Sequence, residues 1–154
     1  MKTNKHVIWD FVSRNQKRFQ ELADKVWSTP ETCYSEQNSM SAHVDELIYH
    51  GFSVTKGIAN IPTAVVGEYG TDGPIIAFLG EYDALAGLSQ KADVFHQDPI
   101  KKGANGHGCG HNLLGSASMQ AAVALKEWLK DSNLPGVVRS VSYTHLRAHE
   151  TNSH

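Results

Sequence analysis

The chain has 154 residues, of which 40% are hydrophobic, and its formal net charge is −2. This length and composition fit one modest globular domain and exclude collagen, coiled coil and intrinsic disorder. The near-neutral charge gives no electrostatic reason to expect nucleic acid or membrane as a partner, and no segment approaches the roughly 18 unbroken apolar residues of a membrane span. Two cysteines without an export signal predict free thiols and a cytoplasmic location.

Helical periodicity marks the first third of the chain. Apolar side chains recur at helical spacing over residues 4–28, and Pro30 is expected to end this helix, because the residue before a proline is pushed out of the α region. A second helix is predicted over about residues 35–50. Gly51 is its expected C-terminal cap.

Short β-rich segments follow over residues 52–55 and 63–67. The continuous apolar run at 74–79 predicts a strand buried on both faces. Residues 69–73 have the composition of a hairpin turn, which predicts that the second and third of these strands pair. Residues 80–110 are irregular, and loops of that length in compact domains are usually functional or disordered.

A further helix is predicted over residues 113 to about 130, capped by Asn112, and another strand begins at Val137. This order of helices and strands predicts an α/β layered domain, in which sites lie outside the carboxyl ends of the strands. GEYDALAG (80–87) directly follows the apolar strand, and GHGCGHN (106–112) directly precedes the helix. Both segments are therefore expected at the same end of the sheet.

The second of these segments carries one cysteine and two histidines: His107, Cys109 and His111. A thiolate and an imidazole two residues apart can bind one or two divalent ions where glycines let the backbone bend. Two alternatives stay open at this point. The stretch can be a glycine-rich turn with an incidental thiol, or Cys109 can be a nucleophile with His107 or His111 as its base. His107, between two glycines, can also be only a structural hydrogen-bonding residue.

Glu81 and Asp83 are the natural second contributors to such a site. Alternation at the end of a strand places both carboxylates on the same side, and a carboxylate there can orient a metal-bound histidine. The competing interpretation is a solvated acidic loop, since exposed acidic residues are common. A metal centre needs at least three ligands with an open position, so the remaining ligands must come from elsewhere.

Residues 141–151 (VSYTHLRAHET) break the pattern and resemble the translation of a transposon-type sequencing adapter. We therefore expect residues 140–154 to be a non-native tail and the natural sequence to stop near Arg139 or Ser140. Three histidines fall in this tail and are not counted as ligands: His145, His149 and His154.

Taken together, the segments resemble the zinc-exopeptidase-like amidohydrolases, the group of aminoacylases, auxin-conjugate hydrolases and glutamate carboxypeptidases. The resemblance covers residues 20–139 in order. It rests on Pro30-Glu31 with Tyr34 and Glu36, on IPTAVVGEYG (61–70), GEYDALAGLSQ (80–90), GHGCGHNLLGSASMQAAVALKEWL (106–129) and LPGVVR (134–139). Agreement among separate segments favours the metal site over the incidental turn.

The resemblance implies a metal-dependent amide hydrolase with two divalent ions, zinc or manganese. It makes Cys109 and His111 metal ligands, with the cysteine able to bridge the two ions, and Asp83 the acid that supports catalysis from behind the metal site. Glu81 and His107 receive supporting roles. The implied fold is α/β, the N-terminal part of a three-layer helix-sheet-helix catalytic domain. Residues 1–139 would be an incomplete portion of it.

The same resemblance predicts what lies beyond the matching part. A glutamate pair that supplies the general base and a ligand, later histidine ligands and a lid domain follow in the family. The lid implies a homodimer or hetero-oligomer of the longer protein. The expected substrate is a small amide, such as an N-acyl amino acid, a short peptide or aminobenzoyl-glutamate, and the chain as given is expected to be inactive. The alternatives are a metal-binding remnant without hydrolase activity and a cysteine-dependent amidase that uses Cys109.

Overall fold

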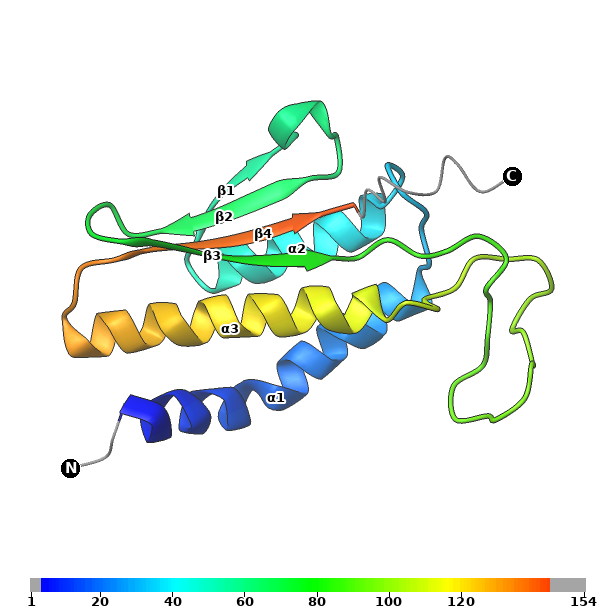
Figure 1. Ribbon diagram of the computed structural model, residues 1–154, viewed down its shortest axis with the longest axis horizontal. Coiled ribbons are helices and arrows are strands. Elements are labelled where there is room, and N and C mark those ends of the chain that lie inside the picture. The colour runs from blue at the N-terminus through cyan, green and yellow to red at the C-terminus, as the bar shows by residue number, and fades with distance from the viewer. Residues whose placement is uncertain (1–3, 145–154) are drawn as a thin grey trace, which may run out of the picture.

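The computed structural model describes residues 4–144, and the side chains from residue 6 onward. Within this range it has a four-stranded sheet and three α-helices (Figure 1). In chain order the elements are α1 (Asn4–Ser28), α2 (Gln37–Tyr49), β1 (Ser53–Lys56), the short 3-10 helix η1 (Ile58–Asn60), β2 (Val65–Tyr69), β3 (Ile75–Glu81), α3 (His111–Ser132) and β4 (Val137–Tyr143). The predicted α/β class is confirmed, and no helix in residues 4–144 is long and apolar enough to cross a bilayer.

The sheet has the order β1-β2-β4-β3, so the predicted hairpin between β2 and β3 is wrong. β4 lies between these two strands, antiparallel to β2 and parallel to β3. The chain runs from β3 through α3 to β4, which is a crossover connection of the kind that parallel neighbours require. Residues 69–73 therefore turn the chain past the end of β4 and close no hairpin.

β3 is an edge strand in the described part of the chain, which corrects the prediction that it is buried on both faces. It has one neighbour, β4, and three of its large apolar side chains are 44–57% exposed: Ile75, Ile76 and Leu79. An exposed apolar edge strand is a template for further pairing. The apolar sequence of β3 thus suits a central strand, while its position in this chain is peripheral.

The helices gather on one face of the sheet. α2 packs on β1 and β2, α3 packs on β3 and β4, and α1 lies against α3 farther out (Figure 1). One buried cluster joins side chains from all of these layers, including Phe19 of α1, Leu47 of α2, Met119 of α3 and Val138 of β4. Among residues 4–144 no helix covers the opposite face, so the three-layer arrangement is incomplete, as expected.

α3 begins earlier than the sequence suggests. Its first residue is His111, and its N-cap is Gly110, whose φ of 74° is left-handed and suits glycine. Asn112, predicted to be the cap, lies inside the first turn, where its side-chain amide donates to the carbonyl of Ala23. The early start makes His111 part of the helix, so its direction is set by the helix backbone. The ends of α1 at Ser28 and of α2 just before Gly51 agree with prediction.

The first four residues of the predicted non-native tail lie in β4 and in register with its neighbours. Ser140 pairs with Phe78 of β3, and Val141 pairs with Leu79. The remaining tail residues from His145 onward lie outside the described residues. Strand pairing requires only backbone groups, so this register does not distinguish a natural sequence from a foreign one.

A buried histidine predicts acid sensitivity. His43 in α2 is fully buried, its Nδ1 lies 3.0 Å from Ser142 Oγ, and burial lowers its pKa from 6.5 to about 4. Between pH 4 and 6.5 the unfolded chain therefore binds more protons than the folded chain. The contribution of His43 to the free energy of unfolding is complete above pH 6.5 and is lost as the pH falls towards 4. The loss from this one group is up to about 3 kcal/mol.

The matching measurement is urea unfolding of the native chain and of His43→Gln across this pH range. We expect the free energy of unfolding of the variant to fall less steeply as the pH decreases. The difference in slope should correspond to at most one bound proton. His96→Gln, at an exposed position of the long loop, is the control and should follow the native chain. Identical slopes for His43→Gln and the native chain would contradict a neutral buried imidazole.

Candidate metal centre

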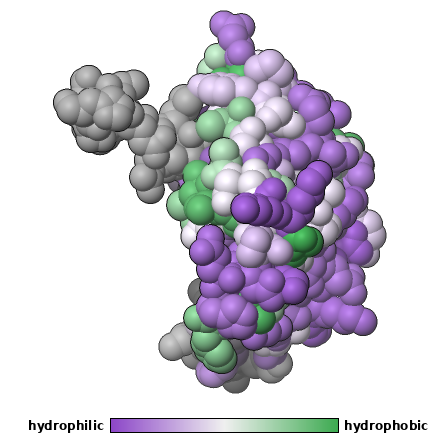
Figure 2. Space-filling model, turned by 90° about the vertical axis from the view of Figure 1, so that its right-hand side faces the viewer, coloured by the Kyte–Doolittle hydropathy of each residue, from purple (hydrophilic) through white to green (hydrophobic). Residues whose placement is uncertain are grey.

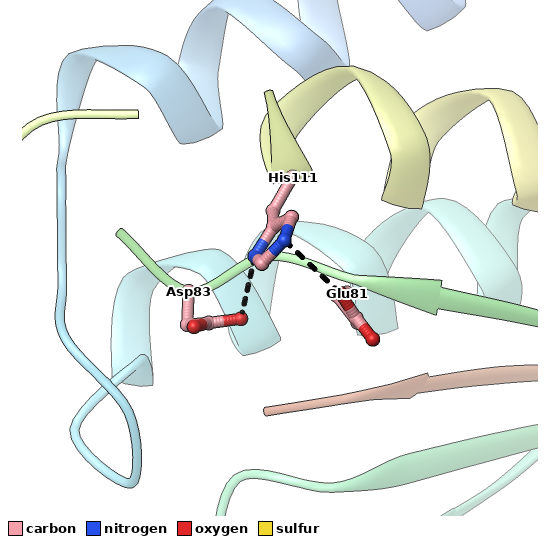
Figure 3. A group of neighbouring side chains, drawn as sticks. All are labelled: Glu81, Asp83 and His111. Carbon is pink, nitrogen blue, oxygen red and sulfur yellow. Dashed lines mark hydrogen bonds and ion pairs between the residues drawn. The ribbon is translucent and has the colours of Figure 1, made fainter. Parts of the chain in front are cut away.

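Two carboxylates and one imidazole meet where β3 ends and α3 begins (Figure 3). Nδ1 of His111 lies 2.9 Å from Oδ1 of Asp83, and its Nε2 lies 3.1 Å from Oε2 of Glu81. The ligand atoms of all three residues lie within 4.8 Å of one another. The sequence interpretation that both carboxylates face the same way, towards the 106–112 segment, is therefore matched by their positions.

Burial makes this cluster unlike a solvated acidic loop. The side chains of His111, Glu81 and Asp83 are 10%, 13% and 3% exposed. Carboxylates are rarely so buried unless they are paired or coordinate a metal. The Nδ1–H of His111 can donate to Asp83, which fixes the ring and leaves Nε2 for a ligand position beside Glu81. One imidazole and two carboxylates are a donor set that fits a divalent ion.

Backbone hydrogen bonds bring the two motif segments together. The N–H of Leu85 donates to the carbonyl of Gly106, and the N–H of Gly106 donates to that of Leu85. A Cβ at Gly106 would lie 2.0 Å from the carbonyl oxygen of Leu88, so the two segments approach too closely for any residue other than glycine at this position. The long loop between them protrudes from this end of the molecule (Figure 1), whose surface is mostly polar with small apolar patches (Figure 2).

Cys109 is not part of the cluster that the structure brings together. It is exposed and forms no disulfide with the other cysteine, and the metal-type grouping in the described residues contains Glu81, Asp83 and His111 without it. Cys109 sits two residues before His111, next to Gly110. Its predicted role as a ligand stays a prediction.

His107 faces the body of the domain. Its Nε2–H donates to the carbonyl of Val26 at 3.1 Å, near the end of α1, and its Nδ1 is buried without a hydrogen-bond partner. Burial is the main reason that the pKa of His107 is lowered, which favours the neutral ring. The contact ties the glycine-rich segment to α1, which agrees with the structural interpretation of this residue.

Sequence reasoning gave no role to two glutamates near the cluster, Glu31 and Glu36. Glu31 caps α2, because its carboxylate accepts hydrogen bonds from the backbone N–H groups of Asn38 and Ser39. Glu36 is fully buried and accepts a hydrogen bond from Thr63 Oγ1 at 2.7 Å. Their place in the segments that carry the family resemblance was the available signal, but burial cannot be read from one sequence.

No family model matches the chain. Among curated proteins, it is 45% identical over 132 residues to a subunit of p-aminobenzoyl-glutamate hydrolase from Escherichia coli K12. The match covers 86% of this chain and 27% of the relative, so the chain spans about a quarter of that protein's length. The likeness to this type of amidohydrolase that the sequence predicts is confirmed.

Solved structures show the same fold. A dinuclear metal-binding peptidase of the M20 family from Bacillus subtilis superposes with a TM-score of 0.66 and 22% identity, over 84% of this chain and 35% of that one. A putative aminohydrolase from methicillin-resistant Staphylococcus aureus gives a TM-score of 0.67 and 19% identity, over 91% and 34% of the two chains. In each case this chain corresponds to about a third of a larger structure.

Proposed function

From this kinship we propose that the chain is the N-terminal portion of a metal-dependent amide hydrolase. The observation that carries the proposal is the position of the His111 ring, which lies between the carboxylates of Glu81 and Asp83. All three side chains are buried or nearly so, at the carboxyl end of β3. A solvated acidic loop has no reason to bury two carboxylates around one imidazole. The 45% identical relative is named as a hydrolase, which supports the reaction class.

The roles proposed for the individual residues follow from their positions. His111 and Cys109 are ligands of a pair of divalent ions, zinc or manganese. Asp83 supports catalysis by holding the His111 ring through Nδ1, and Glu81 lies on the Nε2 side, where it supports the bound ion. His107 has a supporting role through its contact with α1. Cys109 would have to turn inward, and the glycines beside it permit that movement.

A divalent ion held there would polarise the scissile carbonyl and make a water molecule more acidic. The residues of this chain bind and orient. Asp83 keeps the His111 ring in one tautomer, and the low exposure of the cluster strengthens every interaction between its charges. The general base and the further ligands belong to the part of the longer protein that this chain does not include.

The proposed division of the chain is residues 1–139 as catalytic-domain sequence and 140–154 as a non-native tail. The exposed apolar side chains of β3 support a longer domain, because such an edge suits another strand. We expect that longer protein to be cytoplasmic and to carry a lid domain through which it forms a homodimer or hetero-oligomer; the relative is named as one subunit of its enzyme. Its substrate would be aminobenzoyl-glutamate, an N-acyl amino acid or a short peptide.

The function is tested on the longer protein. Source DNA is read without amplification beyond the codon for Arg139, and the encoded protein is purified and offered these three substrate classes. We expect hydrolysis of at least one of them, loss of activity with a chelator, and recovery with zinc or manganese. The 154-residue chain should be inactive. Metal-independent hydrolysis would contradict the proposal, as would a gene that encodes the same adapter-like residues followed by a stop codon.

A second candidate is a metal-binding remnant without hydrolase activity. The exposed position of Cys109 favours it, because only three candidate donors are already gathered in the described residues. It predicts that the longer gene product does not exist. The cysteine-dependent amidase is separated by a different pair of treatments: alkylation of Cys109 in a fully metal-loaded enzyme would abolish activity, and chelators would have no effect.

A further inference from the structure

β3 ends at Glu81, and Asp83 lies two residues beyond it, yet both carboxylates reach the same imidazole. Something must fix the direction of this segment. Between the two acids lies Tyr82, whose side chain is fully buried. Its hydroxyl donates to the carbonyl of Thr63, and its ring meets the edge of His43 at a centroid distance of 4.9 Å.

Thr63 is itself held in place. Its Oγ1 donates to Oε2 of Glu36 at 2.7 Å, and Thr63 and Glu36 are both fully buried. The three residues therefore form a hydrogen-bonded chain from the start of α2, through the segment before β2, to the end of β3. Burial, followed by the charge of Glu36, raises the pKa of Tyr82, which keeps the hydroxyl protonated as a donor.

We propose that Tyr82 is a positioning residue, anchored through Thr63 and Glu36, that turns the carboxylates of Glu81 and Asp83 towards His111. Side chains of successive residues in an extended stretch point to opposite sides, so holding the Tyr82 side chain on one side places those of Glu81 and Asp83 together on the other, towards His111. An alternative is that Tyr82 only fills space. The difference lies in the hydroxyl, because the ring alone would fill the same volume.

The inference rests on the proposed metal site, but it can be tested separately from it. The first readout needs no metal: the imidazole Nδ1–H of His111 in ¹H–¹⁵N spectra, which its hydrogen bond to Asp83 protects from exchange. The second is zinc affinity. Both are measured on the full chain with its three tail histidines changed to glutamine, so that they bind no zinc: His145→Gln, His149→Gln and His154→Gln.

We expect Tyr82→Phe to lose the protected His111 signal and to bind zinc about 10- to 100-fold more weakly, the usual effect of removing an outer partner of a metal ligand. Tyr69→Phe is the matched control and should change neither, because Tyr69 packs on Phe52 away from the cluster. Should Tyr82→Phe fail to fold, the double variant Glu36→Gln/Thr63→Val removes the hydrogen bond that holds Thr63. It does so without leaving a buried carboxylate that has lost its hydrogen-bond donor. It should weaken the same signal.

An unchanged His111 signal in a folded Tyr82→Phe variant would overturn the positioning role, as would an unchanged signal in the double variant when the first does not fold. If the parent chain shows the His111 signal but binds no zinc, Glu81, Asp83 and His111 do not hold an ion without the further ligands of the longer protein. The spectra then still decide whether Tyr82 directs the carboxylates.

Discussion

Zinc binding is expected to fall by more than about 100-fold when His111 is replaced by alanine, because loss of a ligand costs at least as much as loss of an outer partner. His111 is the residue on which both carboxylates converge, so no neighbouring side chain can replace it. The measurement is a calorimetric zinc titration of the chain whose tail histidines are changed to glutamine. His96→Ala, which changes an exposed histidine of the long loop, is the control and should bind as the parent does. Equal affinity of His111→Ala and the parent would remove His111 from the site.

A methyl group at Gly115 is expected to cost about 2 kcal/mol of stability. Its Cβ would lie 2.5 Å from the carbonyl oxygen of Glu81 and 2.9 Å from Cε1 of His43, so α3 or the end of β3 must move. Overpacking of this kind costs about 1–3 kcal/mol, and contact with a backbone oxygen belongs at the upper end or beyond. The better helix propensity of alanine offsets about 1 kcal/mol of this overpacking cost.

Urea unfolding of Gly115→Ala measures the net effect, and Ala117→Gly, at an exposed position of the same helix, measures the propensity contribution by itself. Because Glu81 must shift, zinc affinity should fall together with stability in Gly115→Ala. A variant as stable as the parent, with unchanged zinc affinity, would show that α3 can retreat from β3 without disturbing the cluster.

Local signals predicted the helices well. Proline at position 30 and glycine at position 51 ended α1 and α2 where expected, because both act through the backbone of one or two residues. The start of α3 was placed too late, since asparagine is a common cap and Gly110 caps α3 here without a side-chain hydrogen bond. The resulting error of two residues decided whether His111 belonged to a helix.

The strand order could not be read from the sequence in the same way. A turn composition at residues 69–73 indicates a reversal, but it does not say that the strands on either side pair. β4 separates them through contacts between residues about 70 positions apart, such as Glu68 with Arg139. The exposure of β3 depends likewise on which neighbours are present, and an apolar run does not encode that number.

The candidate site divides along a similar line. Glu81 and Asp83 were found because they follow an apolar strand and alternation places them on one side, and His111 because it lies in a glycine-rich segment before a helix; the family resemblance then joined the two segments. Tyr82, Thr63 and Glu36 were given no role at the site, since a tyrosine, a threonine or a glutamate carries no sign of burial in one sequence. Cys109 was placed by resemblance, and the described structure leaves it exposed.

The most direct test of the metal centre is anomalous diffraction at the zinc edge from a zinc-soaked crystal of the chain lacking the tail histidines. We predict one strong peak about 2.0–2.1 Å from Nε2 of His111, between that atom and Glu81, with Cys109 Sγ about 2.3 Å away if the thiolate turns inward. Zinc found only at other side chains, with the His111 cluster unchanged, would contradict the account.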